Sequence, residues 1–165
     1  MTDYPLELIA EMSIALVGFA GVVSALGRSR LSVATLSFRI RALLFNGVTA
    51  VVFSLLPIIL AVHGLSETVL WAVAAILLGI TQVCTMIWAA RRVSTLTDDE
   101  VPTAIRRIVF TTMTISVLYL SYGVGIQSEW LSAIYLVGLS ASFCVGLLHF
   151  CFLVTSIQSS AKEGI

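Results

Sequence analysis

Two carboxylates lie close together at the start of an apolar stretch of this sequence. Glu7 and Glu11 are four residues apart, so they lie one turn apart on the same side of a helix. Glu11 lies about 6 Å deeper along the helix axis, at a rise of 1.5 Å per residue. A charge at the centre of a bilayer costs about 2.5–3.5 kcal/mol. Glu11 is therefore a headgroup-facing anchor, a protonatable group, or part of an acidic mouth that attracts cations.

Uncharged polar side chains recur in the later apolar stretches. Two of them are amides, which cost several kcal/mol in hydrocarbon when they have no hydrogen-bond partner. A segment rich in hydroxyls, 111–123, and a polar stripe in the last apolar stretch add further groups. The candidates for a polar stripe lining a water-filled path are Glu7, Glu11, Asn46, Gln82, Thr112, Ser116, Tyr119, Ser142 and His149.

The sequence lacks the usual signs of catalysis. It has no Gly-rich phosphate loop, no metalloprotease motif and no plausible pair of nucleophile and base, so we expect no enzyme, catalytic residue or cofactor. Cys84, Cys144, Cys151 and His149 do not follow a metal-binding spacing, and no metal site is expected. The cysteines are interpreted as buried reduced thiols. A haem held by two histidines is disfavoured, because His63 lies at the outer end of its predicted helix and His149 lies in the inner half of the membrane.

Small residues continue the helical face on which the two glutamates lie. Gly18, Gly21 and Ala25 follow Glu7 and Glu11 on this stripe. Small side chains allow two helix backbones to approach closely, and such surfaces drive helix association in lipid. We interpret Gly18, Gly21 and Ala25 as a helix-packing seam, either within one chain or between copies.

The composition identifies the environment in which these residues act. Of the 165 residues, 59% are hydrophobic and 11% are charged, with a mean hydropathy of +1.06. Soluble domains carry roughly a quarter charged residues, so the sequence indicates an integral membrane protein. The formal net charge of zero argues against a nucleic-acid partner, because no overall positive field attracts phosphates. The expected partner is the lipid bilayer.

Five apolar stretches are long enough to cross a bilayer, which needs about 20 residues in a helix. They cover about 6–26, 42–62, 68–90, 108–126 and 130–154. Short gaps make the second and third helices one hairpin and the fourth and fifth another. We predict a single all-α transmembrane domain over 1–165, in which 32–40 extends the second helix. Pro57 should bend that helix and free a carbonyl near Phe53.

The basic residues predict how the chain is threaded. With five spans, all nine Lys and Arg residues face one side of the membrane, whereas four spans would divide them between both sides. Excess Lys and Arg mark the cytoplasmic side, so we predict an outer N-terminus and an inner C-terminus in a plasma (inner) membrane. The expected cytoplasmic anchors are Arg28, Arg30, Arg39, Arg41, Arg91, Arg92, Arg106 and Arg107.

Two functions from different classes fit these observations. The first is a small homo-oligomeric pore or channel, cation-favouring through an acidic outer mouth at Glu7 and Glu11. In this case polar groups from the first, fourth or fifth helix line the path, and the ions that pass through it are the partners of the protein. The second is a non-transporting scaffold, assembly or sensor subunit whose polar stripes pack against partner helices. A channel requires Glu11 in water near a symmetry axis, whereas a packing protein requires the same stripe to be dry.

Overall fold

The computed structural model describes residues 4–26, 33–93, 103–126 and 130–162, and within them it contains five α-helices and no strand. The helices are α1 (Tyr4–Leu26), α2 (Val33–Val62), α3 (Glu67–Val93), α4 (Thr103–Ile126) and α5 (Leu131–Lys162). Each is long and apolar enough to cross a membrane. The predicted all-α fold with five such helices is confirmed, and it suggests an integral membrane protein.

Several helices are longer than the apolar stretches that predicted them. Helix α2 begins at Val33 rather than near 42, as expected if 33–40 extends the second helix. Helix α5 continues to Lys162, beyond the apolar stretch that ends near 154, and α4 begins at Thr103 rather than near 108. The difference arises because backbone hydrogen bonds continue a helix where its side chains are already polar.

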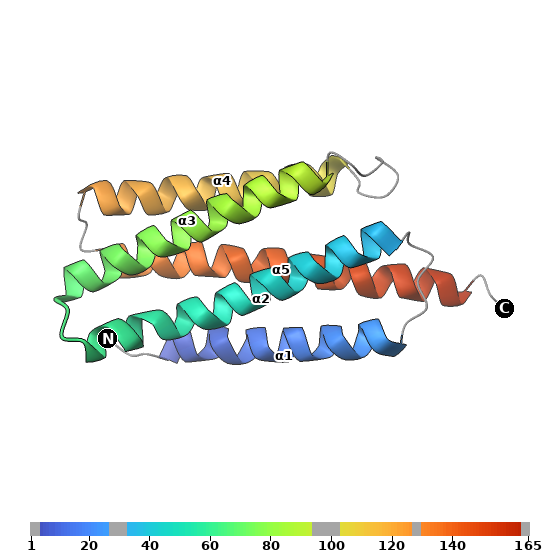
Figure 1. The fold of residues 1–165 in the computed structure, drawn as a ribbon, viewed down its shortest axis with the longest axis horizontal. Coiled ribbons are helices and arrows are strands. Elements are labelled where there is room, and N and C mark those ends of the chain that lie inside the picture. Colours follow the sequence, from blue (N-terminus) through green and yellow to red (C-terminus); the bar gives the residue numbers. More distant parts are fainter. Residues whose placement is uncertain (1–3, 27–32, 94–102, 127–129, 163–165) are drawn as a thin grey trace.

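The five helices lie side by side and alternate in direction along the chain (Figure 1). Helices α1, α2, α3 and α4 each contact the next in sequence, and α5 contacts all four. Because of these directions, the arginines of α2, α3 and α4 lie at one end of the bundle, which we call the arginine end. Glu7 and Glu67, in the first turns of α1 and α3, lie at the opposite end.

Helix α5 is the central element because one of its faces is buried along most of its length. Tyr135, Leu139, Ser142, Val145 and Leu153 recur on this face, and none is more than 1% exposed. The exterior of the bundle is as apolar as its interior, with large side chains such as Phe19 and Leu118 more than 60% exposed. In lipid, hydrophobic patterning therefore does not separate the inside of the bundle from the outside.

Glycines let the helices approach α2 and α5 closely. A Cβ on Gly47 of α2 would collide with Val17 of α1, and one on Gly123 of α4 would come within 2.8 Å of Ile134. A Cβ on Gly138 of α5 would come within 3.0 Å of Leu120, whereas one on Gly146 would make an ordinary contact with Asn46 at 3.5 Å. Three of the four glycines lie on α4 and α5, at the contacts that make α5 central.

Gly18 and Gly21, which the sequence favours for packing, take no part in these contacts. Both are exposed, and a Cβ added to either would meet nothing within 4 Å. A seam within the chain is therefore the wrong interpretation of these two glycines, and a seam between copies stays a prediction. The physical reason is that α1 buries its other face, with Leu6, Ser13 and Ala20 turned towards the bundle.

The carbonyl that Pro57 frees has found a partner on another helix. Proline has no N–H, so the carbonyl of Phe53, four residues earlier, loses its helical hydrogen bond. The Tyr135 hydroxyl donates a hydrogen bond to this carbonyl from α5. Tyr135 is fully buried, and its ring also packs against Trp71 of α3 with 5.6 Å between the ring centroids. One side chain thus connects α5 to both α2 and α3.

Replacing Tyr135 with Phe should lower the free energy of unfolding by about 1–2 kcal/mol, because it leaves the Phe53 carbonyl unpaired in an apolar interior. In a Pro57→Ala background the new N–H can bind this carbonyl, so the same replacement should cost less than half as much. Reversible unfolding in mixed micelles, followed by circular dichroism, measures both values. Tyr119→Phe is the matched control, since Tyr119 is exposed. An equal cost in both backgrounds would contradict the coupling.

Candidate functional site

Three of the predicted polar residues meet in the middle of the bundle. The Gln82 side chain of α3 donates through Nε2 to the Gly138 carbonyl at 2.8 Å and to the Ser142 hydroxyl at 3.0 Å, both on α5. Its Oε1 accepts a hydrogen bond from the Ser116 hydroxyl of α4 at 2.9 Å. All three side chains are at most 3% exposed. We call Gln82, Ser116 and Ser142 the Gln82 cluster.

The hydrogen-bonding groups of the Gln82 side chain are occupied by other helices, whereas in a pore lining they would bind water or ions. Both Gln82 donors and its acceptor are directed at neighbouring helices rather than at an open path. On α5, the stripe of Ser132, Tyr135, Ser142, Gly146 and His149 is the buried inner face of the helix. The structure thus brings together polar groups of α3, α4 and α5 as contacts between helices. The sequence pattern alone is equally compatible with a wet lining.

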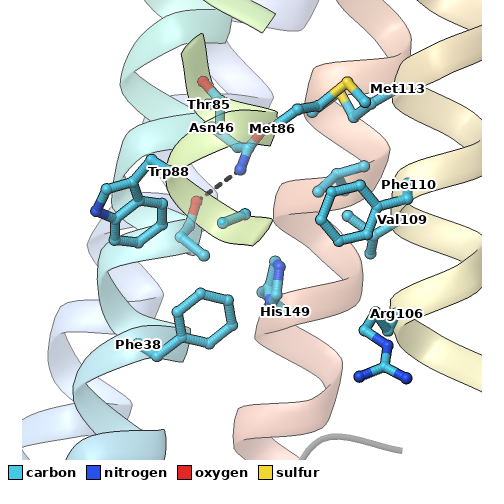
Figure 2. Close-up of a pocket in the computed structure, with 13 residues that line it drawn as sticks. Phe38, Asn46, Thr85, Met86, Trp88, Arg106, Val109, Phe110, Met113 and His149 are labelled. Atoms are coloured by element: carbon cyan, nitrogen blue, oxygen red, sulfur yellow. Dashed lines mark hydrogen bonds between the residues drawn. The ribbon is translucent and has the colours of Figure 1, made fainter. Parts of the chain in front are cut away.

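A cavity of about 40 Å³ lies closer to the arginine end, between α2, α3, α4 and α5 (Figure 2). Since one water needs about 10–15 Å³ of such volume, the cavity has room for roughly two or three. Its lining is mostly apolar and aromatic. It consists of Phe38, Ala42, Asn46, Thr85, Met86, Trp88, Ala89, Arg106, Val109, Phe110, Met113, Val145 and His149.

His149 is the most polar side chain at the centre of this cavity. Figure 2 shows its ring between Phe38 and the side of the cavity formed by Phe110 and Arg106. The imidazole is 9% exposed and makes an edge contact with Phe38 at 6.0 Å between ring centroids. No described residue forms a hydrogen bond with its ring nitrogens, and the cavity beside the ring has room for water.

Asn46 and Trp88 complete the polar and aromatic walls of the cavity. Asn46 donates to the Ala42 carbonyl one turn back on its own helix at 2.7 Å, so its amide is satisfied locally. Trp88 stacks on Phe38 with 5.6 Å between the ring centroids and 20° between the planes. Asn46 and His149, predicted as members of one polar stripe, thus line the same cavity, while the Gln82 cluster is a separate set of contacts.

Glu7 and Glu11 differ from the Gln82 cluster and from the cavity beside His149, which are both buried inside the bundle. Both are exposed on α1, whose buried side faces α2 and α5. Gly18 and Gly21 are exposed as well, and they continue the same outward surface. We call Glu7, Glu11, Gly18 and Gly21 the outward face of α1. Within the described ranges, nothing in the chain covers this face at the two glycines.

The remaining predicted residues occupy varied positions. Thr112 is half-buried and Tyr119 is exposed on α4. Arg41, Arg91, Arg92 and Arg107 are exposed and Arg106 is half-buried, whereas the Arg39 guanidinium donates to the Phe152 carbonyl of α5 at 3.2 Å. Arg28 and Arg30 lie outside the described residues. Ala25 belongs to α1, but its side chain is not described.

The cysteines correct one interpretation of the sequence. Cys84, Cys144 and Cys151 are free thiols, but all three are exposed on the bundle rather than buried. An apolar stretch of sequence predicts burial in a soluble protein, but in a membrane helix it also covers the side that faces lipid. Cysteines in such a stretch can therefore be exposed on the bundle surface. Within the ranges that the structure describes, no three His, Cys, Asp or Glu residues lie close enough to hold a metal ion.

Ser13 and the glycines that pack are the residues that sequence reasoning missed. Ser13 is fully buried on α1, and its hydroxyl has no hydrogen-bond partner. It lies where α1 approaches Gly47, whose Cβ position is 3.9 Å from the Ser13 carbonyl oxygen. A signal for α5 did exist, because Gly138, Ser142 and Gly146 form a repeat of small residues every fourth position.

Replacing Gln82 with Met, which keeps the side-chain length, should lower the free energy of unfolding by about 2 kcal/mol. It removes three hydrogen bonds between helices, each worth about 0.6 kcal/mol on average in membrane proteins. Thr81→Val is the matched control, because the Thr81 hydroxyl donates to Leu77 on its own helix. Unfolding in mixed micelles compares the two variants. Equal losses would show that the Gln82 cluster adds nothing beyond local packing.

No family model, curated protein or solved structure matches this sequence.

Proposed function

We propose that this chain is the subunit of a small homo-oligomeric membrane pore that favours cations. Copies meet through the outward face of α1, and Glu7 and Glu11 form the acidic mouth of the path. The observation that supports this proposal is the position of Glu11. It is exposed on the bundle surface within the apolar span Pro5–Val22.

A carboxylate facing lipid inside such a span is unfavourable, and burial between copies or contact with water relieves the cost. The described part of the chain supplies no cation to neutralise Glu11, since its arginines lie at the arginine end. Nothing lies within 4 Å of the Cβ positions of Gly18 and Gly21, so the backbone of a neighbouring helix can approach them closely. One face thus combines an association surface with an acidic group.

The path in this proposal runs between copies. Within one chain, the Gln82 cluster is paired internally, and the cavity beside His149 has room for only a few waters. These pairings favour contacts between helices over a lining role for Gln82, Ser116 and Ser142, and the Asn46 amide nitrogen donates to a carbonyl of its own helix. The outward face of α1 remains as the lining, with Glu11 as its deepest charged group.

A second candidate function is the non-transporting scaffold or assembly subunit. The internal pairing of the Gln82 cluster favours it, because polar groups used as contacts between helices are what a packing protein requires. In this case the outward face of α1 meets a partner helix and stays dry. The two functions share the same surface and differ in whether water reaches Glu11.

The purified particle should have the mass of an oligomer, and liposomes containing it should conduct potassium. Glu11→Gln should reduce this flux several-fold, because it removes the charge that concentrates cations at the mouth. Glu67→Gln, at the same end of the bundle on α3, is the matched control and should leave the flux unchanged.

The other outcomes separate the alternatives. A monomer without flux would overturn the pore, and an oligomer without flux would favour the scaffold. An oligomer whose flux ignores Glu11→Gln would keep the pore but remove the proposed mouth. Gly18→Leu tests the surface itself: it should leave the fold intact, because its site is open, but break the oligomer. Gly47→Leu should instead destabilise the fold through its collision with Val17.

The orientation belongs to the same proposal. We infer that the arginine end faces the cytoplasm and that the end carrying Glu7 and Glu67 faces outward, in a plasma (inner) membrane. The support is that the described arginines of α2, α3 and α4 gather at one end of the bundle, as the cytoplasmic excess of basic residues requires.

Labelling of single cysteines on intact cells tests this orientation. With Cys84, Cys144 and Cys151 replaced by Ser, a membrane-impermeant maleimide should modify Ser66→Cys, in the exposed turn before α3, on intact cells. Lys162→Cys, at the end of α5, should react only after the cells are opened. The reverse pattern, or equal labelling of both, contradicts the inferred orientation.

A further inference from the structure

Besides the cavity beside His149, a groove opens on the surface of the bundle between α2 and α3. It lies apart from the outward face of α1. It is a groove of about 640 Å³, a size typical of ligand sites. Its lining comes from neighbouring turns of the two helices and consists of Arg41, Leu44, Phe45, Val48, Cys84, Thr85 and Trp88. The stretch from Arg41 to Val48 spans about 10 Å at the helical rise of 1.5 Å per residue.

The groove is apolar along its length and cationic at one end. Leu44, Phe45 and Val48 are between 38% and 53% exposed, so they offer their side chains to a ligand. Arg41 is exposed at the arginine end and forms no hydrogen bond or ion pair with the residues that the structure describes. Trp88, at the same end of α3, is of the type that sits at membrane–water interfaces.

We propose that this groove binds one anionic phospholipid from the leaflet at the arginine end. The phosphate group accepts hydrogen bonds from the Arg41 guanidinium, which matches its geometry. The upper part of an acyl chain lies along Leu44, Phe45 and Val48, with Trp88 at the level of the glycerol. Basic residues next to apolar surface attract anionic lipids in this way.

Charge favours a lipid over a second copy of the chain as the occupant. The acidic residues that the structure describes, Glu7, Glu11 and Glu67, belong to the half of the bundle away from the arginine end. The described helices of a second copy packed here in alignment would therefore bring arginines to Arg41, while the acids at 98–100 and 163 lie outside the described residues. An anionic headgroup with an apolar tail matches both parts of the groove. This inference is independent of the outward face of α1, which lies on a helix without contact to α3.

The fluorescence of Trp88 reports whether a lipid occupies the groove. In a variant with Trp71→Phe and Trp130→Phe, the protein is placed in phosphatidylcholine vesicles containing a minor fraction of a lipid brominated on its upper acyl carbons. Brominated phosphatidylglycerol should quench Trp88 at lower mole fractions than brominated phosphatidylcholine. Arg41→Gln should weaken this preference about fivefold, the effect of one basic residue at an anionic surface.

Two controls keep the test specific. Arg107→Gln removes an exposed arginine of α4 that does not line the groove, and it should leave the preference unchanged. Arg41→Lys keeps the positive charge and should retain most of the preference for phosphatidylglycerol. Circular dichroism confirms that each variant is folded.

Three results would overturn the proposal. The first is equal quenching by both brominated lipids, and the second is a preference that survives in Arg41→Gln. The third concerns Cys84, which is exposed in the groove. With Cys144 and Cys151 replaced by Ser, efficient crosslinking between Cys84 residues in the presence of phosphatidylglycerol would show that a second copy occupies the groove.

Discussion

Lipid supplies no hydrogen-bond partners, so a polar group inside this apolar bundle is either paired within the protein or carries a cost in free energy. Gln82 shows the constraint most clearly. Its amide binds Gly138 and Ser142 on α5 and accepts from Ser116 on α4, so one side chain connects three helices. The cost of leaving such an amide unpaired determines how α3, α4 and α5 are placed around it. Apolar contacts alone do not, since the exterior of the bundle is equally apolar.

The same constraint explains how α2 joins the centre of the bundle. Pro57 leaves the Phe53 carbonyl without its helical N–H, and Tyr135 of α5 supplies the missing donor. Gly47 removes the side chain that would hold α1 and α2 apart. Donors and acceptors are thus paired where the backbones come closest. Helix α5 touches all four other helices because its buried face combines hydroxyls with small residues.

Unlike Gln82 and Tyr135, Glu11 has no partner in the described part of the chain, and it is the basis of the proposed function. Its helix turns it outward, away from the groups that could have satisfied it within the chain. The glycines on the same face leave room for another helix. Arg41, at the other end of the bundle, likewise has no partner among the described residues. The unpaired charges therefore lie on surfaces where copies, water or lipid headgroups can meet them.

The sequence by itself determined the number, order and approximate length of the helices, because hydropathy over about 20 residues is a local property. It also identified the carbonyl of Phe53, since the effect of Pro57 is local as well. Only the tertiary structure decided which side of each helix is buried. In a chain that is apolar all round, Gly18 and Gly47 look alike, as do the polar stripes of α1 and α5. Distant partners distinguish them: Val17 covers Gly47, Gln82 pairs with Ser116 and Ser142, and no described residue covers Gly18.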